Sequence, residues 1–218
     1  MNLVKRIIVY CIGLFFLALG VTLSIKSNLG VSPVSSLPYV ISLISGYSTG
    51  AMITVMFSLY VGIQIVILGK NFKVVNLLQI LFATIFGYFV NYTDFLVSSY
   101  MPWNYIVQLA TLGVSIVFLG IGIVLYLKAD VMPLPAEGLL IAVQTKTTMP
   151  FHNLKVSFDA IVVVLSIALS FVFMGQIVGI REGTVIAAIL VGKCVGMINR
   201  IFSRQLHQLA IFMKLPVE

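Results

Sequence analysis

Six long apolar runs constrain the fold of this chain more than any other feature. Each has close to the roughly 20 mostly apolar residues that an α-helix needs to cross about 30 Å of hydrocarbon. We expect membrane-spanning helices over residues 4–25, 51–68, 74–92, 106–127, 156–174 and 184–202. Charged residues make up 9% of the sequence, whereas ordinary globular proteins carry about a quarter. The sequence therefore predicts an all-α integral membrane protein.

Several other classes of protein are disfavoured. The net charge is +7, but the basic residues occupy short gaps between apolar runs and form no basic stripe with interleaved aromatics, so nucleic acid is not an expected partner. No Walker loop or GxGxxG motif is present. The two histidines, His152 and His207, lie far apart and build no cluster with metal-site spacing. We expect no enzyme activity, no metal and no cofactor.

One segment of the chain occurs twice. Residues 20–37 align without a gap to residues 122–139, at a constant offset of 102 positions. The identical pairs are Gly20/Gly122, Leu23/Leu125, Lys26/Lys128, Pro33/Pro135 and Leu37/Leu139. In both copies a long apolar run ends in a lysine, passes through a proline-bearing turn and enters a shorter apolar run, 34–44 or 136–143. These shorter runs cannot cross a bilayer.

The repeat predicts the domain organisation. Residues 1–92 and 105–202 each contain three long runs and one short run, and residues 93–104 connect them. Because three is an odd number of spans, the second copy must enter the bilayer inverted relative to the first. We expect two inverted three-helix repeats, each with a short re-entrant or broken helix, and an amphipathic tail over residues 203–218 that lies on the membrane surface. This plan is typical of secondary transporters.

The basic residues predict the orientation. With six spans and a cytoplasmic N-terminus, only Lys26 and Arg181 fall on the outer side and Lys193 lies within a span. The remaining ten Lys and Arg residues are then cytoplasmic, as the positive-inside rule requires. We expect both termini in the cytoplasm.

The duplicated segment also holds the candidate substrate site. We expect Lys26 and Lys128 to attract an anionic group, although lysines at helix ends also commonly snorkel to the membrane surface. Hydroxyl, amide and carboxylate side chains and two prolines that interrupt the helices would line the site. These residues are Asn28, Ser32, Pro33, Ser35, Asp130 and Pro135.

Three ionisable residues within apolar runs are candidates for proton or ion coupling. Asp159 and Lys193 lie in the fifth and sixth runs and could pair, either as a structural bridge or as a proton-linked couple. Glu137 lies in the second short run, where it either titrates or faces the cytoplasm.

Two motifs resemble a known family. Leu29-Gly30-Val31-Ser32-Pro33, followed by a short apolar run and a Gly-Tyr-Ser-Thr-Gly element over residues 46–50, is similar to the YczE/YitT-like family of small bacterial membrane proteins. The second copy departs from this pattern, with Met132 at the position of Gly30. The resemblance implies a multi-pass protein of the bacterial inner membrane, for which transport is suspected.

The sequence thus favours a secondary transporter that moves a small polar, anionic or zwitterionic, metabolite by alternating access. Its expected partners are the lipid bilayer and the small-molecule substrate, and it would act alone or as a homodimer. Two rival hypotheses stay open. One is a non-transporting accessory or maturation factor that docks another protein, and the other is the substrate-binding subunit of a larger transporter.

Overall fold

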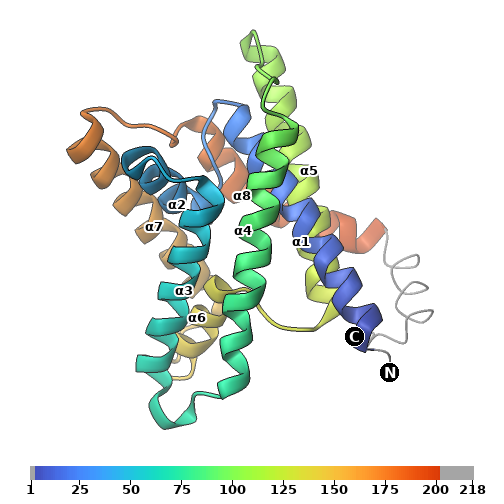
Figure 1. Ribbon diagram of the computed structural model, residues 1–218, viewed down its shortest axis with the longest axis vertical. Helices are drawn as coiled ribbons and strands as arrows, with labels where there is room; N and C mark the ends of the chain where they lie inside the picture. The colour runs from blue at the N-terminus through green and yellow to red at the C-terminus, as the bar shows by residue number, and fades with distance from the viewer. Residues whose placement is uncertain (1–2, 202–218) are drawn as a thin grey trace.

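The computed structural model describes residues 3–201, which form eight α-helices, two short 3-10 turns and no β-strand (Figure 1). The helices are α1 (Leu3–Lys26), α2 (Pro33–Ser45), α3 (Thr49–Leu68), α4 (Leu78–Leu96), α5 (Tyr105–Ala129), α6 (Pro135–Gln144), α7 (Phe151–Met174) and α8 (Glu182–Ile201). The 3-10 turns η1 (Gly69–Asn71) and η2 (Val74–Leu77) connect α3 to α4. The expected amphipathic tail over residues 203–218 lies outside the described residues.

Six helical segments are long and apolar enough to cross a membrane. They are Leu3–Lys26, Thr49–Asn71, Val74–Leu96, Tyr105–Ala129, Phe151–Met174 and Glu182–Arg200. The prediction of an all-α membrane protein with six spans is therefore confirmed. The ends differ from the apolar runs by a few residues, because a helix continues beyond the apolar stretch where caps and polar residues satisfy its terminal groups. At the start of α3, for example, the Ser48 hydroxyl accepts a hydrogen bond from the Ala51 N–H at 3.3 Å.

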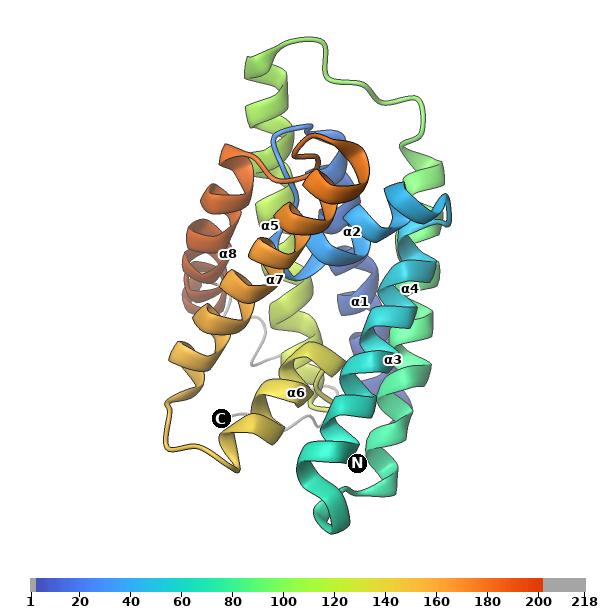
Figure 2. The ribbon, with the colours of Figure 1, turned by 90° about the vertical axis from the view of Figure 1, so that its left-hand side faces the viewer.

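Helices α1 and α5 lie side by side through the centre and run in opposite directions (Figure 2). Their backbones touch at glycines: a Cβ atom on Gly122 would lie 2.5 Å from the Leu17 nitrogen, and one on Gly13 would lie 2.6 Å from the Tyr126 nitrogen. Small residues allow such close approach between membrane helices. The identity of Gly122 with Gly20 in the duplicated segment thus has a packing explanation, since Gly20 similarly faces the Leu119 nitrogen.

The two short runs form the short helices α2 and α6, as the sequence predicts. Both begin with a proline at the first helical turn, where the missing N–H is not needed. Helix α2 lies toward one end of the bundle and α6 toward the other, and each begins in the interior (Figure 2). Helix α2 packs mainly on α7 and less on α3, whereas α6 packs mainly on α3 and less on α7. Each short helix is therefore held largely by a long helix of the other half of the chain.

The connection that leads into α2 is fixed by the loop between α7 and α8. The Val31 N–H donates to the Gly179 carbonyl at 2.9 Å, and the Gly183 N–H donates to the Leu29 carbonyl at 2.8 Å. Gly30 has a φ of 109°, which only glycine adopts readily. The Leu-Gly-Val-Ser-Pro motif is thus part of a tertiary contact between the first and second halves.

The Gly-Tyr-Ser-Thr-Gly element over residues 46–50 is a helix boundary. Gly46 ends α2 in the left-handed conformation, and its N–H donates to the Ser42 carbonyl. Gly50 packs directly against the backbone of Gly87 in α4, and its N–H donates to Asn91 Oδ1 at 2.9 Å. The element therefore starts α3 and seats it on α4.

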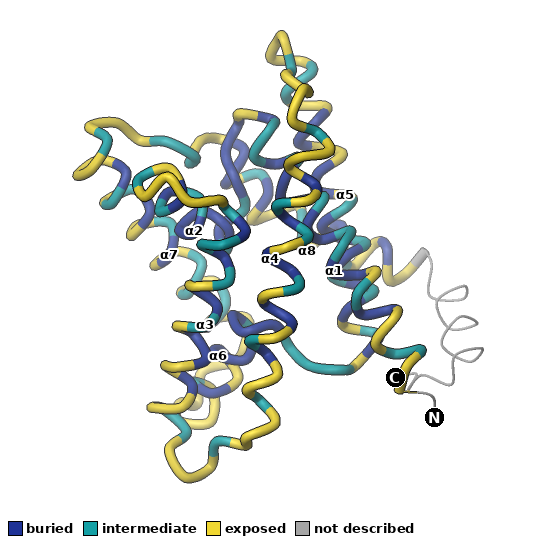
Figure 3. Tube along the Cα trace, viewed as in Figure 1, coloured by how far each residue is buried: buried dark blue, intermediate teal, exposed yellow. Residues whose placement is uncertain are grey.

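The outer helices leave much apolar surface exposed, and buried residues gather in the middle of the bundle (Figure 3). On α7, the side chains of Phe171, Val172 and Phe173 are each more than half exposed. In a chain with six spanning helices such a surface faces lipid, which is as apolar as a protein core.

Candidate functional site

A group of polar side chains surrounds the first turn of α6 in the interior. Gln64 of α3 donates through Nε2 to Gln79 Oε1 of α4 at 2.9 Å and to the Pro135 carbonyl at 3.2 Å. Both glutamines are almost completely buried. A Cβ atom on Gly138 would lie 2.9 Å from Gln79 and 3.0 Å from Gln64, so only glycine lets the amides approach α6 this closely. The two amides hold the start of α6, where Glu137 lies.

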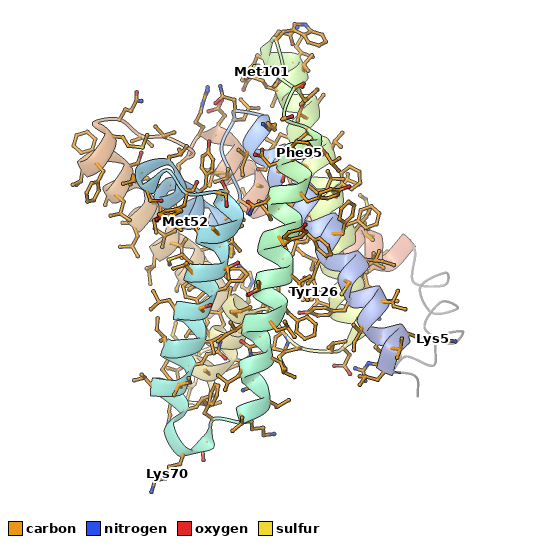
Figure 4. The ribbon with its side chains drawn as sticks, in the orientation of Figure 1. Lys5, Met52, Lys70, Phe95, Met101 and Tyr126 are labelled. Carbon is orange, nitrogen blue, oxygen red and sulfur yellow. The ribbon has the colours of Figure 1, made fainter. Side chains whose placement is uncertain are left out.

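Glu137 carries the central carboxyl group of this cluster. Its Oε2 atom is shielded from solvent and has no hydrogen-bond partner among residues 3–201, whereas the residue as a whole keeps a little accessible surface. Tyr126 of α5 directs its hydroxyl at this carboxyl within hydrogen-bonding reach, and lies inside the bundle (Figure 4). The charges of Lys155 and Asp159, both on α7, also act on Glu137, with opposite signs.

The protonation of Glu137 is set mainly by burial. Helix α6 is not one of the six spanning helices, and burial raises the pKa of the Glu137 carboxyl above its ordinary value of 4.5. The positive charge of Lys155 and the Tyr126 hydroxyl oppose this shift without cancelling it. The neutral, protonated form is thus favoured over a wider pH range than for a glutamate in water.

Two tyrosines bring further unpaired hydroxyl groups to the interior. Tyr10 of α1 is fully buried and Tyr60 of α3 is 5% exposed, and neither hydroxyl has a hydrogen-bond partner in the described part of the chain. The Tyr10 ring lies 6.0 Å from the Tyr126 ring and 4.7 Å from the Phe82 ring, centroid to centroid. Tyr10 is also close enough to Glu137 for electrostatic interaction. Buried tyrosine hydroxyls usually find a partner, and neither of these two has one within residues 3–201.

Helix α7 completes the cluster with a salt bridge. Lys155 Nζ lies 2.7 Å from Asp159 Oδ1, one helical turn away. The centroid of the Phe158 ring lies 5.5 Å from the centroid of the Tyr60 ring and 6.0 Å from Lys155 Nζ. Side chains from α1, α3, α4, α5, α6 and α7 therefore meet around Glu137 and the adjacent Lys155–Asp159 pair.

A second, neutral group of polar residues lies at the start of α2. The Ser32 hydroxyl donates to the Ser35 hydroxyl at 3.2 Å and does not cap the helix. Ser36 donates to the Pro33 carbonyl at 2.7 Å and shares a hydrogen bond of 2.9 Å with Ser166 of α7. Ser32, Pro33 and Ser35, for which the sequence predicts site roles, lie at the start of α2, where Pro33 and Ser35 are buried and Ser32 is partly exposed.

Lys26 and Asn28 lie at the end of α1, away from this interior. Lys26 forms an ion pair with Asp94, at the end of α4, with Nζ and Oδ1 3.2 Å apart. Asn28 is exposed, and its carbonyl accepts a hydrogen bond from Arg181 at 3.0 Å. Lys26 therefore already has a negative partner.

Lys128 and Asp130 lie at the end of α5, on the opposite side of the bundle. Asp130 is exposed and binds Arg6, with Oδ2 and Nη2 2.6 Å apart, and Arg6 also donates to the Ala129 carbonyl. Lys128 is half-buried and forms no ion pair within residues 3–201. Because α1 and α5 are antiparallel and α1 alone, with 24 residues, spans about 36 Å, Lys26 and Lys128 cannot contact one small substrate together.

The suggested pairing of Asp159 with Lys193 does not occur. Asp159 binds Lys155 on its own helix, and Lys193 is exposed on α8 between the exposed Gly192 and Gly196. A partner one turn away on the same helix is reached without bringing two helices together, which explains the preference.

Sequence analysis missed Tyr10, Tyr60, Gln64, Gln79 and Tyr126. The two glutamines carry the signal that could have identified them, because an amide inside a membrane span needs a partner. The tyrosines carry no such signal, since aromatic residues are common in membrane helices. Within residues 3–201 no three His, Cys, Asp or Glu side chains are grouped closely enough to hold a metal ion.

The chain matches, over residues 4–200, the family described as a family of unknown function (DUF6198). It belongs to this family. One relative is the uncharacterized protein YyaS of Bacillus subtilis (strain 168), which is 28% identical over 198 residues, covering 89% of this chain and 92% of YyaS. Another is the uncharacterized membrane protein YczE of the same organism, which is 27% identical over 192 residues, covering 88% and 84%.

These relatives confirm the resemblance to YczE-like proteins that the motifs predicted. Together with the six apolar helices, they make the chain a multi-pass membrane protein. No solved structure matches it significantly.

Proposed function

We propose that this protein is a secondary transporter that moves a small polar metabolite across the bacterial inner membrane by alternating access. The observation that carries the proposal is the Glu137 carboxyl group, buried at the start of an interrupted helix with an unpaired oxygen. Broken helices that begin in the interior are typical of transporter substrate sites. The proposal involves no chemical conversion of the substrate, no cofactor and no nucleic acid.

An inverted repeat is part of the proposal, and the helix positions support it. Three pairs of helices begin 102 positions apart, which is the offset of the duplicated sequence segment. The pairs are α1 and α5 (Leu3, Tyr105), α2 and α6 (Pro33, Pro135), and α3 and α7 (Thr49, Phe151). Asn28 and Asp130, at the same offset, are also the two described non-glycine residues with positive φ, 56° and 45°.

The contacts between helices support the same repeat. Helix α2 packs on α7 as α6 packs on α3, and α1 packs on α4 as α5 packs on α8. Gln64 binds the start of α6, and Ser166, at the equivalent position of α7, binds the start of α2. Two halves related in this way can exchange their conformations, which opens the site first to one face and then to the other.

The charges around the site favour a zwitterionic substrate over a purely anionic one. The lysines expected to attract an anion lie at opposite ends of the bundle, and Lys26 is paired with Asp94. The interior instead presents Glu137 and the Lys155–Asp159 pair. A metabolite with an ammonium group could face Glu137, and its anionic group could face Lys155 or the tyrosine hydroxyls.

The distribution of basic residues supports cytoplasmic termini. Lys5 and Lys70 lie in the lower part of the view in Figure 4, and Met101, in a connection without Lys or Arg, lies at its upper end. Under the positive-inside rule the lower end faces the cytoplasm.

Substrate-induced currents in proteoliposomes would test the transport function. The full chain is reconstituted and challenged with a panel of amino acids, amines and small carboxylic acids. We expect at least one zwitterion to give a current or an uptake signal in the wild type and in Lys26→Met. The signal should be lost in Glu137→Gln but kept in Glu182→Gln, which makes the same chemical change at an exposed glutamate. Uptake that survives Glu137→Gln would reject this site, and silence across the panel would favour the accessory-factor hypothesis.

A further inference from the structure

Glu137 differs from the other acidic residues of the described chain. Asp94, Asp130, Asp159 and Glu182 each form an ion pair, with Lys26, Arg6, Lys155 and Arg181 respectively. Glu137 has no such pair within residues 3–201 and keeps a buried oxygen without a hydrogen bond. A carboxyl group in apolar surroundings must be protonated or paired, because an isolated buried charge is very costly. A partner for Glu137 is therefore either a proton or a cation from outside the described chain.

The surroundings of Glu137 are suited to a cation that donates hydrogen bonds. An ammonium group has three N–H donors, and the unpaired acceptors near it include Glu137 Oε2 and the fully buried Tyr10 hydroxyl. The Tyr10 ring lies 4.7 Å from the Phe82 ring and 6.0 Å from the Tyr126 ring, centroid to centroid. Aromatic faces attract cations. A carboxylate ligand at the same position would face a like charge or would need Glu137 to stay protonated.

The other titratable groups that face Glu137 in the described chain carry no unbalanced charge near pH 7. Tyr10 of α1 and Tyr126 of α5 are phenols, which are neutral near pH 7. Lys155 and Asp159 of α7 form a pair whose charges balance. Helix α4 presents Gln79 and Phe82, and α3 presents Gln64 and Tyr60, none of them charged near pH 7.

Resting on the proposed transport function, we infer that Glu137 is an exchange site, whose carboxyl group holds either a proton or the ammonium group of the substrate. The step is balanced: the protonated carboxyl and the ammonium ion give a carboxylate–ammonium pair, and one proton passes to the water on the open side. With a simple amine, the bundle interior carries the same net charge in both states. Because one oxygen site cannot hold both, substrate and proton cross the membrane in opposite directions, which makes the protein a proton antiporter for amine-bearing metabolites.

Proton release on ligand binding tests this inference without requiring transport. The full chain, purified in detergent and held in weak buffer, is mixed with three probes that share a three-carbon skeleton: n-propylamine, β-alanine and propionate. We expect the two amines to release about one proton per chain at a pH where free Glu137 is protonated, and to remove the infrared band of a protonated carboxyl group. In that range their affinity should rise about tenfold per pH unit, because one proton competes with one ligand.

Two variants make the test specific. Glu137→Gln should release no proton and lack the infrared change, and Glu182→Gln should behave as the wild type. Amine binding without proton release, equal proton release from Glu137→Gln, or no response to either amine at millimolar concentration would overturn the exchange site. Substrate currents with propionate alone would leave transport standing and reject the exchange. Proton release without any uptake in proteoliposomes would support the exchange at Glu137 and reject the transport function.

Discussion

At the scale of single residues, Glu137 combines a buried carboxyl oxygen without a hydrogen bond and a raised pKa. Its carboxyl interacts with Tyr10 and Tyr126 and is shielded from water, so a negative charge there is poorly solvated. The nearby Lys155 is already bound to Asp159 at 2.7 Å and offers only partial compensation. The folded protein therefore holds the Glu137 proton more tightly than the unfolded chain does.

This difference predicts a dependence of stability on pH. Protonation of Glu137 stabilises the folded state, because the folded protein binds this proton more tightly than the unfolded chain. The stabilisation is complete below the ordinary pKa of 4.5 and is lost as pH rises through the raised pKa of Glu137. Glu137→Gln imitates the protonated form at every pH. Melting temperatures measured from pH 4.5 upward should diverge, with the variant increasingly more stable than the wild type. Parallel curves for the two proteins would contradict the assignment, and Glu182→Gln provides the control.

Some residues of the candidate site were recognisable in the sequence and others were not. Glu137 was recognisable because a carboxyl group within an apolar run is energetically costly and therefore marks a candidate functional site. Lys26 and Lys128 were both expected to attract an anionic group, but they lie at opposite ends of the antiparallel helices α1 and α5 and cannot contact one small substrate together. Tyr10 and Tyr126 became visible only with tertiary structure, since their rings suit any apolar span.

At the scale of elements, backbone contact between α1 and α5 defines the centre of the bundle. The contact depends on glycines, which place the two helices closer than any side chain would permit. Gly113, also on α5, is exposed and has no neighbour within 4 Å of a Cβ position. The helix thus contains both a critical glycine, Gly122, and a matched control.

Gly122→Val should be strongly destabilising. The added side chain would meet the backbone of Gly13 and Leu17, which cannot move aside without separating the helices. Overpacking costs about 1–3 kcal/mol where neighbours can adjust, and we expect a loss at or above the upper end of that range. Gly113→Val adds the same group to open space and should change the melting temperature little. Similar losses for both variants would argue against the close α1–α5 contact.

Gln64→Leu tests how α6 is held in place. The substitution leaves Gln79 Oε1 and the Pro135 carbonyl without the donor that now serves both. Each unsatisfied buried group costs about 1–3 kcal/mol, so thermal unfolding in detergent should begin at a clearly lower temperature. Adding Gln79→Leu removes one stranded acceptor, and the double variant should lose less than the two single losses combined. Strict additivity would show that the two amides do not interact.

At the scale of the whole molecule, the two halves interlock. Ser36 and Ser166, which share a hydrogen bond between α2 and α7, mark one of the two crossing points. Gln64 and Pro135 mark the other, between α3 and α6. In the proposed transport cycle, we expect the opening of the interior to one face to change at least one of these contacts.

A disulfide at the first crossing point should therefore stop transport. Ser36→Cys with Ser166→Cys, on a background of Cys11→Ala and Cys194→Ala, places two thiols where hydroxyl oxygens now lie 2.9 Å apart, and oxidation must bring the two sulfurs to the roughly 2.05 Å of a disulfide bond. Oxidation should raise the melting temperature and abolish uptake, and a reducing agent should restore uptake. A complete disulfide with undiminished uptake would place the moving contact elsewhere.

The number and type of helices followed from hydropathy, and their interlocking did not. The prolines at 33 and 135 showed where the short helices begin, because proline suits the first helical turn. Nothing in the local sequence specifies that α2 rests on α7, since that contact joins residues 130 positions apart. Only the repeat itself gave a clue that the halves would pack as related units.

The same interlocking sets an order of events during synthesis. Ser36 leaves the ribosome 130 residues before its partner Ser166, which at about 5–20 residues per second is a delay of roughly 7–26 s. Until α7 is inserted, α2 can pack on α3 but lacks the contact with α7 that holds it in the folded protein.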